Sequence, residues 1–356
     1  MTRLTEAPLR ETEVLRAAGA PRAPLCAVLP MNLCLAVGQA IVSANGVFCA
    51  RIDADGRLRV YRGDDADCLW ESARSAEGGR FFALVQSDAN FCIYRGEDLA
   101  HNEGWHWGTQ MTAEGSLFHA HLQDDGEFCI CRGAGPDDCQ GTVWRSGARD
   151  PLERLLHIEA IDYQLGQARL VQSRPSDLYR ETVNNPNLQV QTSMVSGSVT
   201  VSDTTGWSDS LALAGETVPA YRGPVPVVCG GRVQLSGDSG HAYIRNGAAT
   251  TAKTWGFNAP AAVPPRSAMM CLVAAMRSAI VVPYTLRGRF TLRSGRQVEA
   301  SVRGSYTGAN CHDLSVTLST YDPDPAGSYS IRRPLTPMPA IAGAAVPHPI
   351  GAAAFY

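Results

Sequence analysis

The sequence predicts an all-β protein in which a domain of three repeats precedes a second β-rich domain. The 356 residues include 34 Gly and 22 Pro, while only 18% of residues are charged. Such a composition favours many short strands joined by turns over long, charged helices. In addition, one strand-like segment recurs three times before residue 150, and alternating Ser/Thr-rich segments follow it.

The repeats share a polar strand and a tryptophan that follows it. The strand segments start at residues 53, 86 and 123 and read DADGRLRVYRG, QSDANFCIYRG and QDDGEFCICRG. The tryptophans lie at positions 70, 107 and 144, so the period is 37 residues. A fixed period of this size is typical of units that bury their apolar faces only together. We therefore expect the three indole rings to meet in a shared core.

The middle repeat has the most polar strand face. In a continuous strand, alternate side chains point to opposite faces, so Phe91 and Ile93 would be buried. The opposite face would then carry Gln86, Asp88, Asn90, Cys92 and Tyr94. A carboxylate, two amides and a phenol in a row suit the hydroxyls of a sugar. A half-solvated edge strand without any ligand would show the same alternation.

Residues 30–148 resemble the bulb-type mannose-binding lectins (B-lectin domains), whose pattern Q-x-D-x-N-x-V-x-Y occurs once per subdomain of a three-fold, type II β-prism. The resemblance implies that mannose-type glycans bind at the middle repeat. The side chains that it assigns to hydrogen bonds with the sugar are Gln86, Asp88, Asn90 and Tyr94. Cys92 replaces the valine that packs against the sugar ring in that family.

The other two repeats depart from the lectin pattern. The third keeps Gln123 and Asp125 but has Glu127 in place of Asn, so we expect a weaker second site there. An ionised Glu only accepts hydrogen bonds, whereas Asn also donates them. The first repeat has Asp53 and Arg57 at the Gln and Asn positions, and we expect it to be structural.

Beyond residue 150 the chain predicts longer strands with little apolar bulk. Ser and Thr alternate with Val between residues 196 and 202, as in a β-strand. We expect strands at 194–206, 231–246, 269–276 and 279–291. Pro283 removes a ladder donor, so we expect an edge or a bend there.

This second half resembles the aerolysin-type β-pore-forming toxins, in particular their epsilon-toxin and mosquitocidal-toxin branch. The matching phrases are TTGWSDS, TWG, VPP, VVPYT and GSYTG, within residues 204–308. The resemblance implies an elongated β-sheet domain that oligomerises and threads an amphipathic hairpin into a transmembrane β-barrel. The membrane-insertion candidates are Trp207, Leu211, Leu213, Val225 and Val227. Pro219, Pro224 and Pro226 interrupt this stretch, although a regular barrel strand excludes proline.

These observations divide the chain into four parts. We expect a leader (1–28), a lectin domain (29–149), a pore-forming domain (150–332) and a Pro/Ala-rich tail (333–356). The tail is either a strap over the body or an activation peptide that a protease releases at Arg332-Arg333.

Several functional classes are not expected. A net charge of -3 without a basic run argues against nucleic-acid binding. The eleven cysteines show no metal-ligand spacing, so we expect free thiols and neither a metal nor a cofactor. His157, His241 and His312 are isolated, and the chain has no P-loop or dinucleotide fingerprint, so we expect no enzyme.

We therefore expect a mannose-binding lectin that targets cell surfaces and assembles into a homo-oligomeric pore in a lipid membrane. The alternative is a lectin with a β-rich oligomerisation stalk that never inserts; a glycosidase-like enzyme ranks third. The N-terminus does not resemble a signal peptide. We expect the protein to be cytosolic or released by a non-classical route, and to act extracellularly at target membranes.

Overall fold

Strands dominate the computed structural model of the chain. It describes residues 24–63, 67–73, 78–115, 117–214, 219–237, 240–321, 330–334 and 346–348. Within them, the only other regular elements are two single-turn 3-10 helices, η1 (Pro136–Asp138) and η2 (Leu165–Gln167), which confirms the all-β prediction. No helix in this described part of the chain has the length and hydrophobicity that a membrane span requires. The chain divides into two compact units, Met1–Pro151 and Leu152–Tyr356.

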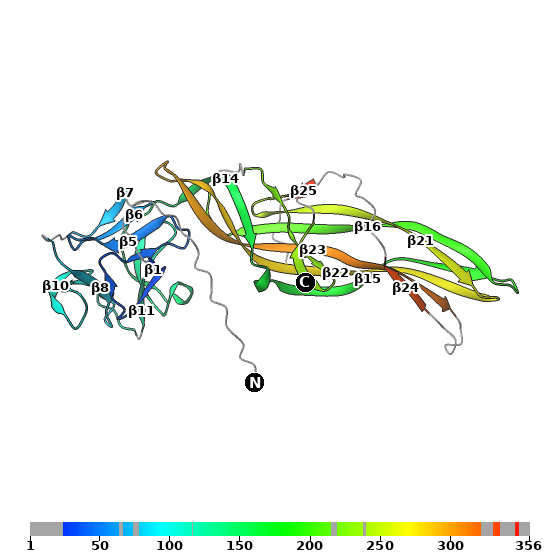
Figure 1. Ribbon diagram of the computed structural model, residues 1–356, viewed down its shortest axis with the longest axis horizontal. Coiled ribbons are helices and arrows are strands. Elements are labelled where there is room, and N and C mark those ends of the chain that lie inside the picture. The colour runs from blue at the N-terminus through cyan, green and yellow to red at the C-terminus, as the bar shows by residue number, and fades with distance from the viewer. Residues whose placement is uncertain are drawn as a thin grey trace, which may run out of the picture. The chain divides into compact units, whose positions relative to one another are not determined.

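The first unit contains three sheets, one for each repeat (Figure 1). Each repeat supplies three consecutive antiparallel strands: β5 (Phe48–Ile52), β6 (Leu58–Arg62) and β7 (Asp67–Glu71); β8 (Phe81–Val85), β9 (Phe91–Gly96) and β10 (Asn102–Gly108); β11 (Phe118–Leu122), β12 (Phe128–Arg132) and β13 (Thr142–Arg145). Short strands from the start of the unit complete the sheets: β1 (Pro24–Cys26) and β4 (Ala40–Val42), β3 (Leu35–Ala36), and β2 (Val28–Pro30). This is the three-fold prism that the sequence predicted.

The tryptophans that recur every 37 residues meet, as predicted. Trp70 lies 5.8 Å from Trp144 and 6.4 Å from Trp107, and Trp107 lies 6.5 Å from Trp144, all between ring centroids. All three pairs are edge-to-face, the arrangement that aromatic rings prefer. The ring of Phe128 continues the cluster inward, where it contacts the fully buried Phe91. One shared aromatic core therefore joins the three sheets.

The second unit is built from long antiparallel strands. They are β14 (Leu152–Tyr163), β15 (Arg169–Asn185), β16 (Gln191–Asp209), β21 (Gly247–Val263), β22 (Ser267–Leu292) and β23 (Gln297–Tyr321). Their order in the sheet is β14-β22-β23-β16-β21, and β15 also pairs with β22. At about 3.3 Å per residue, the 26 residues of β22 span roughly 85 Å. The elongated β-sheet domain predicted from the sequence is thus confirmed.

The strands predicted at 269–276 and 279–291 are one continuous strand, β22. A bulge between Ala274 and Met276 interrupts its register with β23. Buried positions are odd-numbered before the bulge and even-numbered after Arg277, because one extra residue reverses the alternation. The carbonyl of Pro283 accepts a hydrogen bond from Gln164 N (2.9 Å), in the gap between β14 and β15. Proline has no backbone N–H to donate. On this side of β22 no neighbouring strand requires a donor at position 283, because β14 has ended and β15 has not begun.

The prediction of one strand at 231–246 is wrong. The strand predicted at 194–206 is confirmed and lies within β16. Residues 219–237 and 240–246 instead form small elements: β17 (Arg222–Gly223) pairs with β20 (His241–Ala242), and β18 (Pro226–Cys229) pairs with β19 (Arg232–Leu235). Gly230 and Gly231 have φ of +55° and +73°, and they turn the chain tightly between β18 and β19. We call residues 226–235 the β18–β19 hairpin.

Parts of both terminal segments are described. Arg332 and Arg333, the expected protease site, lie in β24 (Ser330–Pro334), which pairs with β23. β25 (Val346–His348) pairs with β21. The expected leader before residue 24 and the remainder of the expected tail lie outside the described residues, so cleavage of the tail stays a prediction.

Candidate functional site

The candidate sugar-binding segment of the middle repeat begins with a turn and continues as a strand. Gln86 N donates to Asn90 O (2.8 Å) and Ala89 N donates to Gln86 O (3.0 Å), closing a tight turn between β8 and β9. Ala89 has a left-handed φ of +72°, and the equivalent residues Gly56 and Gly126 have +76° and +86°. The prediction that one strand face carries the whole polar row is therefore wrong. Glycine at this position of the other two repeats is the sequence signal for the turn.

Gln86, Cys92 and Tyr94 hold one another at the start of β9. Gln86 Nε2 donates to the Tyr94 hydroxyl (3.0 Å), and the Cys92 thiol donates to Gln86 Oε1 (3.2 Å). Cys92 is only 2% exposed, so it orients Gln86 and has almost no surface to pack against a sugar ring. The Tyr94 ring stacks on Phe82 at 5.6 Å. Burial raises the pKa of Tyr94, which keeps the phenol neutral and able to donate.

Asp88 and Asn90 lie at the surface end of the turn. Asp88 Oδ1 accepts a hydrogen bond from the backbone of Asn90 (3.0 Å). Asn90 Oδ1 accepts from the Thr109 hydroxyl and from Gln110 N, both at 3.0 Å, so its amide nitrogen faces outward as a donor. None of the residues that the structure describes forms a salt bridge with Asp88. The second carboxylate oxygen and the amide nitrogen are thus available to a polar ligand.

Trp105 borders this site and was not predicted from the sequence. It pairs with Tyr94 across the β9–β10 ladder, so both side chains project from the same face. Its side chain is 46% exposed and forms a hydrogen bond with Cys92, which lowers the pKa of the thiol against the larger, opposite effect of burial. An exposed indole beside polar groups offers the flat apolar surface that a sugar ring stacks on. The sequence feature that could have predicted this role is that Trp105 does not belong to the series of tryptophans that recur every 37 residues.

Arginine fills the corresponding position of the first repeat. Arg59 occupies the place of Cys92, and its guanidinium contacts Asp55 (2.7 Å), Asp53 (2.7 Å) and Glu71 (2.9 Å). Burial would raise the pKa of Asp53, but hydrogen bonds from Tyr61 and the arginines lower it overall. With its carboxylates neutralised internally, this repeat cannot offer them to a sugar.

The third repeat is also closed at its acidic positions. Asp125 Oδ2 accepts from Arg149 Nε at 2.6 Å, and the buried Glu127 pairs with Arg145 at 3.2 Å. Gln123 lies at the edge of the turn, where its backbone pairs with Glu127. The two residues proposed as a weaker site are therefore adjacent, but one of them already has a cationic partner.

In the second unit, the β18–β19 hairpin docks on the sheet through one buried side chain. Val228 N donates to Asn310 Oδ1 (2.9 Å), and Asn310 Nδ2 donates back to Val228 O (2.8 Å). Asn310 belongs to β23 and is 8% exposed. Among the candidate insertion residues, Val225 is buried just before β18, and Val227 is half-buried within it. The Asn310 side chain thus makes with Val228 of β18 the two hydrogen bonds that the backbone of a neighbouring strand would otherwise make.

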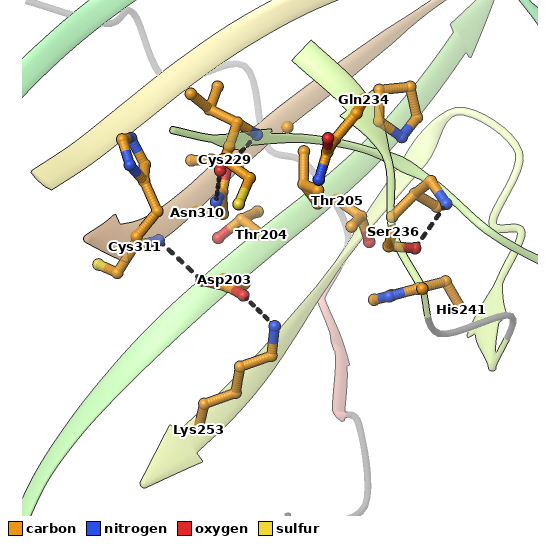
Figure 2. A pocket seen from close by; sticks show the side chains of 18 of the residues that line it. Asp203, Thr204, Thr205, Cys229, Gln234, Ser236, His241, Lys253, Asn310 and Cys311 are labelled. Carbon is orange, nitrogen blue, oxygen red and sulfur yellow. Dashed lines mark hydrogen bonds and ion pairs between the residues drawn. The ribbon is translucent and has the colours of Figure 1, made fainter. Parts of the chain in front are cut away.

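A cavity of about 670 Å³ lies beside this contact. Figure 2 shows its polar lining: Asp203 of β16 accepts from Lys253 Nζ of β21 (2.6 Å) and from Cys311 N of β23 (3.0 Å). The opposite wall consists of β18–β19 hairpin residues, including Cys229 and Gln234. The hairpin therefore covers the sheet without filling the space beneath it.

Trp207, a candidate for membrane insertion, is buried in this structure, and its role in insertion stays a prediction. Trp207 is the third-last residue of β16 and is 2% exposed. Its indole nitrogen donates to the Tyr163 hydroxyl (2.9 Å), and its ring packs against Tyr243 and Tyr306, both at 5.5 Å. Burial raises the pKa of Tyr163 and Tyr243 to about 12 each, so the cluster stays uncharged. Such a core anchors β16 to the sheet.

The remaining insertion candidates lie in a loop after β16. Leu211 and Leu213 are half-buried and are not in a strand. The Leu211 carbonyl accepts a hydrogen bond from Arg245, whose guanidinium also pairs with Asp209 at 2.7 Å. This ion pair fixes the start of the loop to Arg245, which lies between β20 and β21.

Ser278, His312 and Asp313 hydrogen-bond in the order of a hydrolase triad. Ser278 Oγ lies 2.9 Å from His312 Nε2, and His312 Nδ1 lies 2.9 Å from Asp313 Oδ2. However, Ser278 is 1% exposed, and its hydroxyl also contacts Ser173 Oγ at 2.9 Å. A nucleophile must reach a substrate carbonyl. This row instead links β15, β22 and β23 beside the bulge.

Comparisons with known proteins give distant similarities only. No protein-family model and no curated protein matches the chain. A Marasmius oreades lectin is 22% identical with a TM-score of 0.27, covering 35% of this chain and 93% of its own. A monomeric mannose-binding lectin from Gastrodia elata is 20% identical with a TM-score of 0.28, covering 34% and 97%. The Mpp75Aa1.1 beta-pore-forming protein from Brevibacillus laterosporus is 13% identical with a TM-score of 0.35, covering 54% and 79%. Since these scores are below 0.5, the site assignments rest on contacts within this chain.

Proposed function

We propose that the first unit is a lectin that binds mannose-type glycans through its middle repeat. The observation that carries this proposal is that the equivalent acidic residues of the three repeats differ in whether an arginine pairs with them. Asp55 and Asp125 pair with arginines, whereas Asp88 has no cationic partner in the described structure. Asp88 can therefore accept hydrogen bonds from vicinal hydroxyls, while Asn90 and Tyr94 donate. Gln86 holds the tyrosine in place.

Binding to immobilised mannan tests this site. Asp88→Asn keeps the Oδ1 acceptor of the turn but removes the charge, and Asn90→Asp keeps the Oδ1 acceptor but removes the donor. Each loss of a charged or well-oriented hydrogen bond costs about 1.5–3 kcal/mol, so we expect affinity to fall roughly 10–100-fold. Asp55→Ala is the matched control and retains binding. Full binding by both middle-repeat variants would place the site elsewhere.

We further propose that the second unit oligomerises on a target membrane and opens a β-barrel pore. The β18–β19 hairpin supports this proposal because it is docked above a cavity through Asn310 and can leave without breaking the long strands. In this proposal the partners are mannose-containing glycoproteins, a lipid bilayer and further copies of the chain. The protein acts extracellularly at that membrane, without a cofactor and without catalysing a reaction.

Leakage of dye from vesicles that display mannose-rich glycans tests the pore. We expect release that free mannose blocks, together with heat-resistant oligomer bands on gels. The Asp88→Asn variant should bind and leak less in parallel. Glycan binding without leakage would contradict insertion and leave the lectin proposal intact.

A stalk that never inserts is the second candidate. The prolines favour it, since Pro224 and Pro226 flank Val225, and β18 contains only four residues. A membrane strand needs about 9–11 alternating residues. Oligomers that form on glycan-bearing vesicles without dye release would select this function.

A further inference from the structure

The third repeat gathers histidines and cysteines where the middle repeat has its sugar site. β11 pairs with β12 so that His119 lies opposite Cys131 and His121 lies opposite Cys129. Residues directly opposite in an antiparallel ladder project from the same face. One ring nitrogen of each histidine and the Cys131 sulfur lie within 4.8 Å of one another, and all three residues are buried.

Both imidazoles present nitrogen atoms that lack a partner. His119 is fully buried, and its Nδ1 donates to the Gly133 carbonyl at 2.8 Å, which leaves Nε2 with its lone pair. His119 Nε2 and His121 Nδ1 are buried without a hydrogen bond in the described structure. Buried polar atoms without partners are rare in native proteins. A backbone carbonyl that accepts from one ring nitrogen is a usual support of a metal-binding histidine.

The fold itself does not require histidine at these positions. In the middle repeat, Phe82 and Leu84 lie opposite Tyr94 and Cys92 in the same register. This apolar pair packs under the sugar site and is buried. The histidine pair therefore needs an explanation beyond packing of the sheet.

A further thiol is in reach. Cys139 follows η1, is exposed, and forms a hydrogen bond with Cys131. Two imidazoles and two thiols are the ligand set of a tetrahedral zinc site.

We propose that the third repeat binds one Zn²⁺ ion through His119 Nε2, a ring nitrogen of His121, and the sulfurs of Cys131 and Cys139. Tetrahedral zinc places such atoms about 3.3–3.8 Å apart, so small side-chain rotations complete the site. The two thiols release their protons as the Zn–S bonds form, and no oxidant is involved. At the position where the middle repeat has its proposed sugar site, the third repeat would therefore bind a metal ion. The ion would link β11 and β12 to the segment that contains η1.

Metal uptake by the full-length, reduced protein tests this site directly. Purified protein is stripped of metal and titrated with Zn²⁺ against a chromogenic chelator, and separately with Co²⁺ as a spectroscopic substitute. We expect one equivalent of Zn²⁺ per chain, intense visible bands of tetrahedral Co²⁺, and a thiolate charge-transfer band. Zinc should also raise the thermal unfolding temperature, because it binds the folded state.

Variants that copy the middle repeat separate metal binding from folding. His119→Phe combined with His121→Leu reproduces the Phe82/Leu84 pair, so we expect a folded protein that has lost zinc uptake and the thermal shift. Cys131→Ser should weaken the thiolate band and the zinc affinity, a test that holds even if the double variant folds poorly. Cys68→Ser, which alters an exposed cysteine elsewhere, is the control and retains all three signals. Cys139→Ser should weaken the thiolate band and the affinity.

Three results would overturn the proposal. They are the absence of a thiolate–cobalt band in the reduced wild type, equal zinc uptake by the histidine double variant, or a stable Cys131–Cys139 disulfide whose reduction yields no zinc binding.

Discussion

Asp55, Asp88 and Asp125 occupy the same position in three repeats, but their surroundings differ in charge. Arg59 lies across both oxygens of Asp55, and Arg149 contacts Asp125. A carboxylate that an arginine already holds has little to gain from a sugar hydroxyl, because the stronger, charge-assisted partner is in place. At the scale of single residues, the neighbouring side chains thus decide which of the three carboxylates is left without a cationic partner in the described structure.

Trp105 should contribute more to glycan affinity than to stability. Its side chain is 46% exposed and lies beside Tyr94 in the ladder. Stacking on a sugar face is worth about 1 kcal/mol, so we expect Trp105→Ala to weaken mannan binding roughly fivefold. Calorimetric titration measures the affinity, and thermal unfolding serves as the control. Unchanged affinity would remove Trp105 from the site.

The turn before each polar strand should tolerate alanine in one repeat only. A Cβ on Gly56 would lie 2.7 Å from Phe81 Cε1, whereas the middle repeat already holds Ala89 at a similar φ. Left-handed backbone costs about 1–2 kcal/mol for alanine, so Gly56→Ala should lower the free energy of unfolding by about 2 kcal/mol. Ala89→Gly should change it by less than about 1 kcal/mol. Urea unfolding of both variants checks this contrast.

At the scale of elements, the second unit combines continuous strands with one loosely docked hairpin. β22 and β23 are 26 and 25 residues long, and their register is interrupted only at the bulge. The β18–β19 hairpin has two four-residue strands and borders a cavity. Local unfolding should therefore start at the hairpin, since its two short strands pair with each other and not with the long strands of the described sheet, and it borders a cavity.

Asn310→Ala should release the β18–β19 hairpin. The substitution leaves Val228 N and O without their buried partners, at a cost of about 2 kcal/mol for the two hydrogen bonds. We expect trypsin to cleave after Arg222 or Arg232 at least tenfold faster, as mass spectrometry of the fragments would show. Asn258→Ala, an exposed asparagine on β21, is the matched control. Equal cleavage rates in both variants would show that Asn310 does not hold the hairpin.

At the scale of the whole molecule, the one sugar site per chain that we propose would make binding depend on assembly. Linking weak monovalent sites in one oligomer increases the apparent affinity by about 10²–10⁴. We expect much tighter binding to dense mannan surfaces than to free mannose, and surface plasmon resonance at graded mannan densities measures the difference. Affinity that is independent of density would argue against assembly on the target.

The amino-acid sequence alone determined the class of the fold and the frame of the site. The 37-residue period and the strand alternation are local properties, so they predicted the Trp cluster and the repeat domain. The turn at Gln86–Asn90 was also readable, because Gly56 and Gly126 occupy the place of Ala89. The continuous strand predicted there overlooked what these two glycines encode.

Only the tertiary structure decided which groups are neighbours. Asn310 and Val228 are 82 residues apart, Arg149 and Asp125 are 24 apart, and Cys131 reaches His119 from another strand. Burial in the sheet also placed Trp207 in a core. Such pairings depend on how strands align in space, and no spacing along the chain specifies that alignment. Repetition is encoded locally, whereas charge compensation and metal-ligand geometry arise only when distant strands pack together.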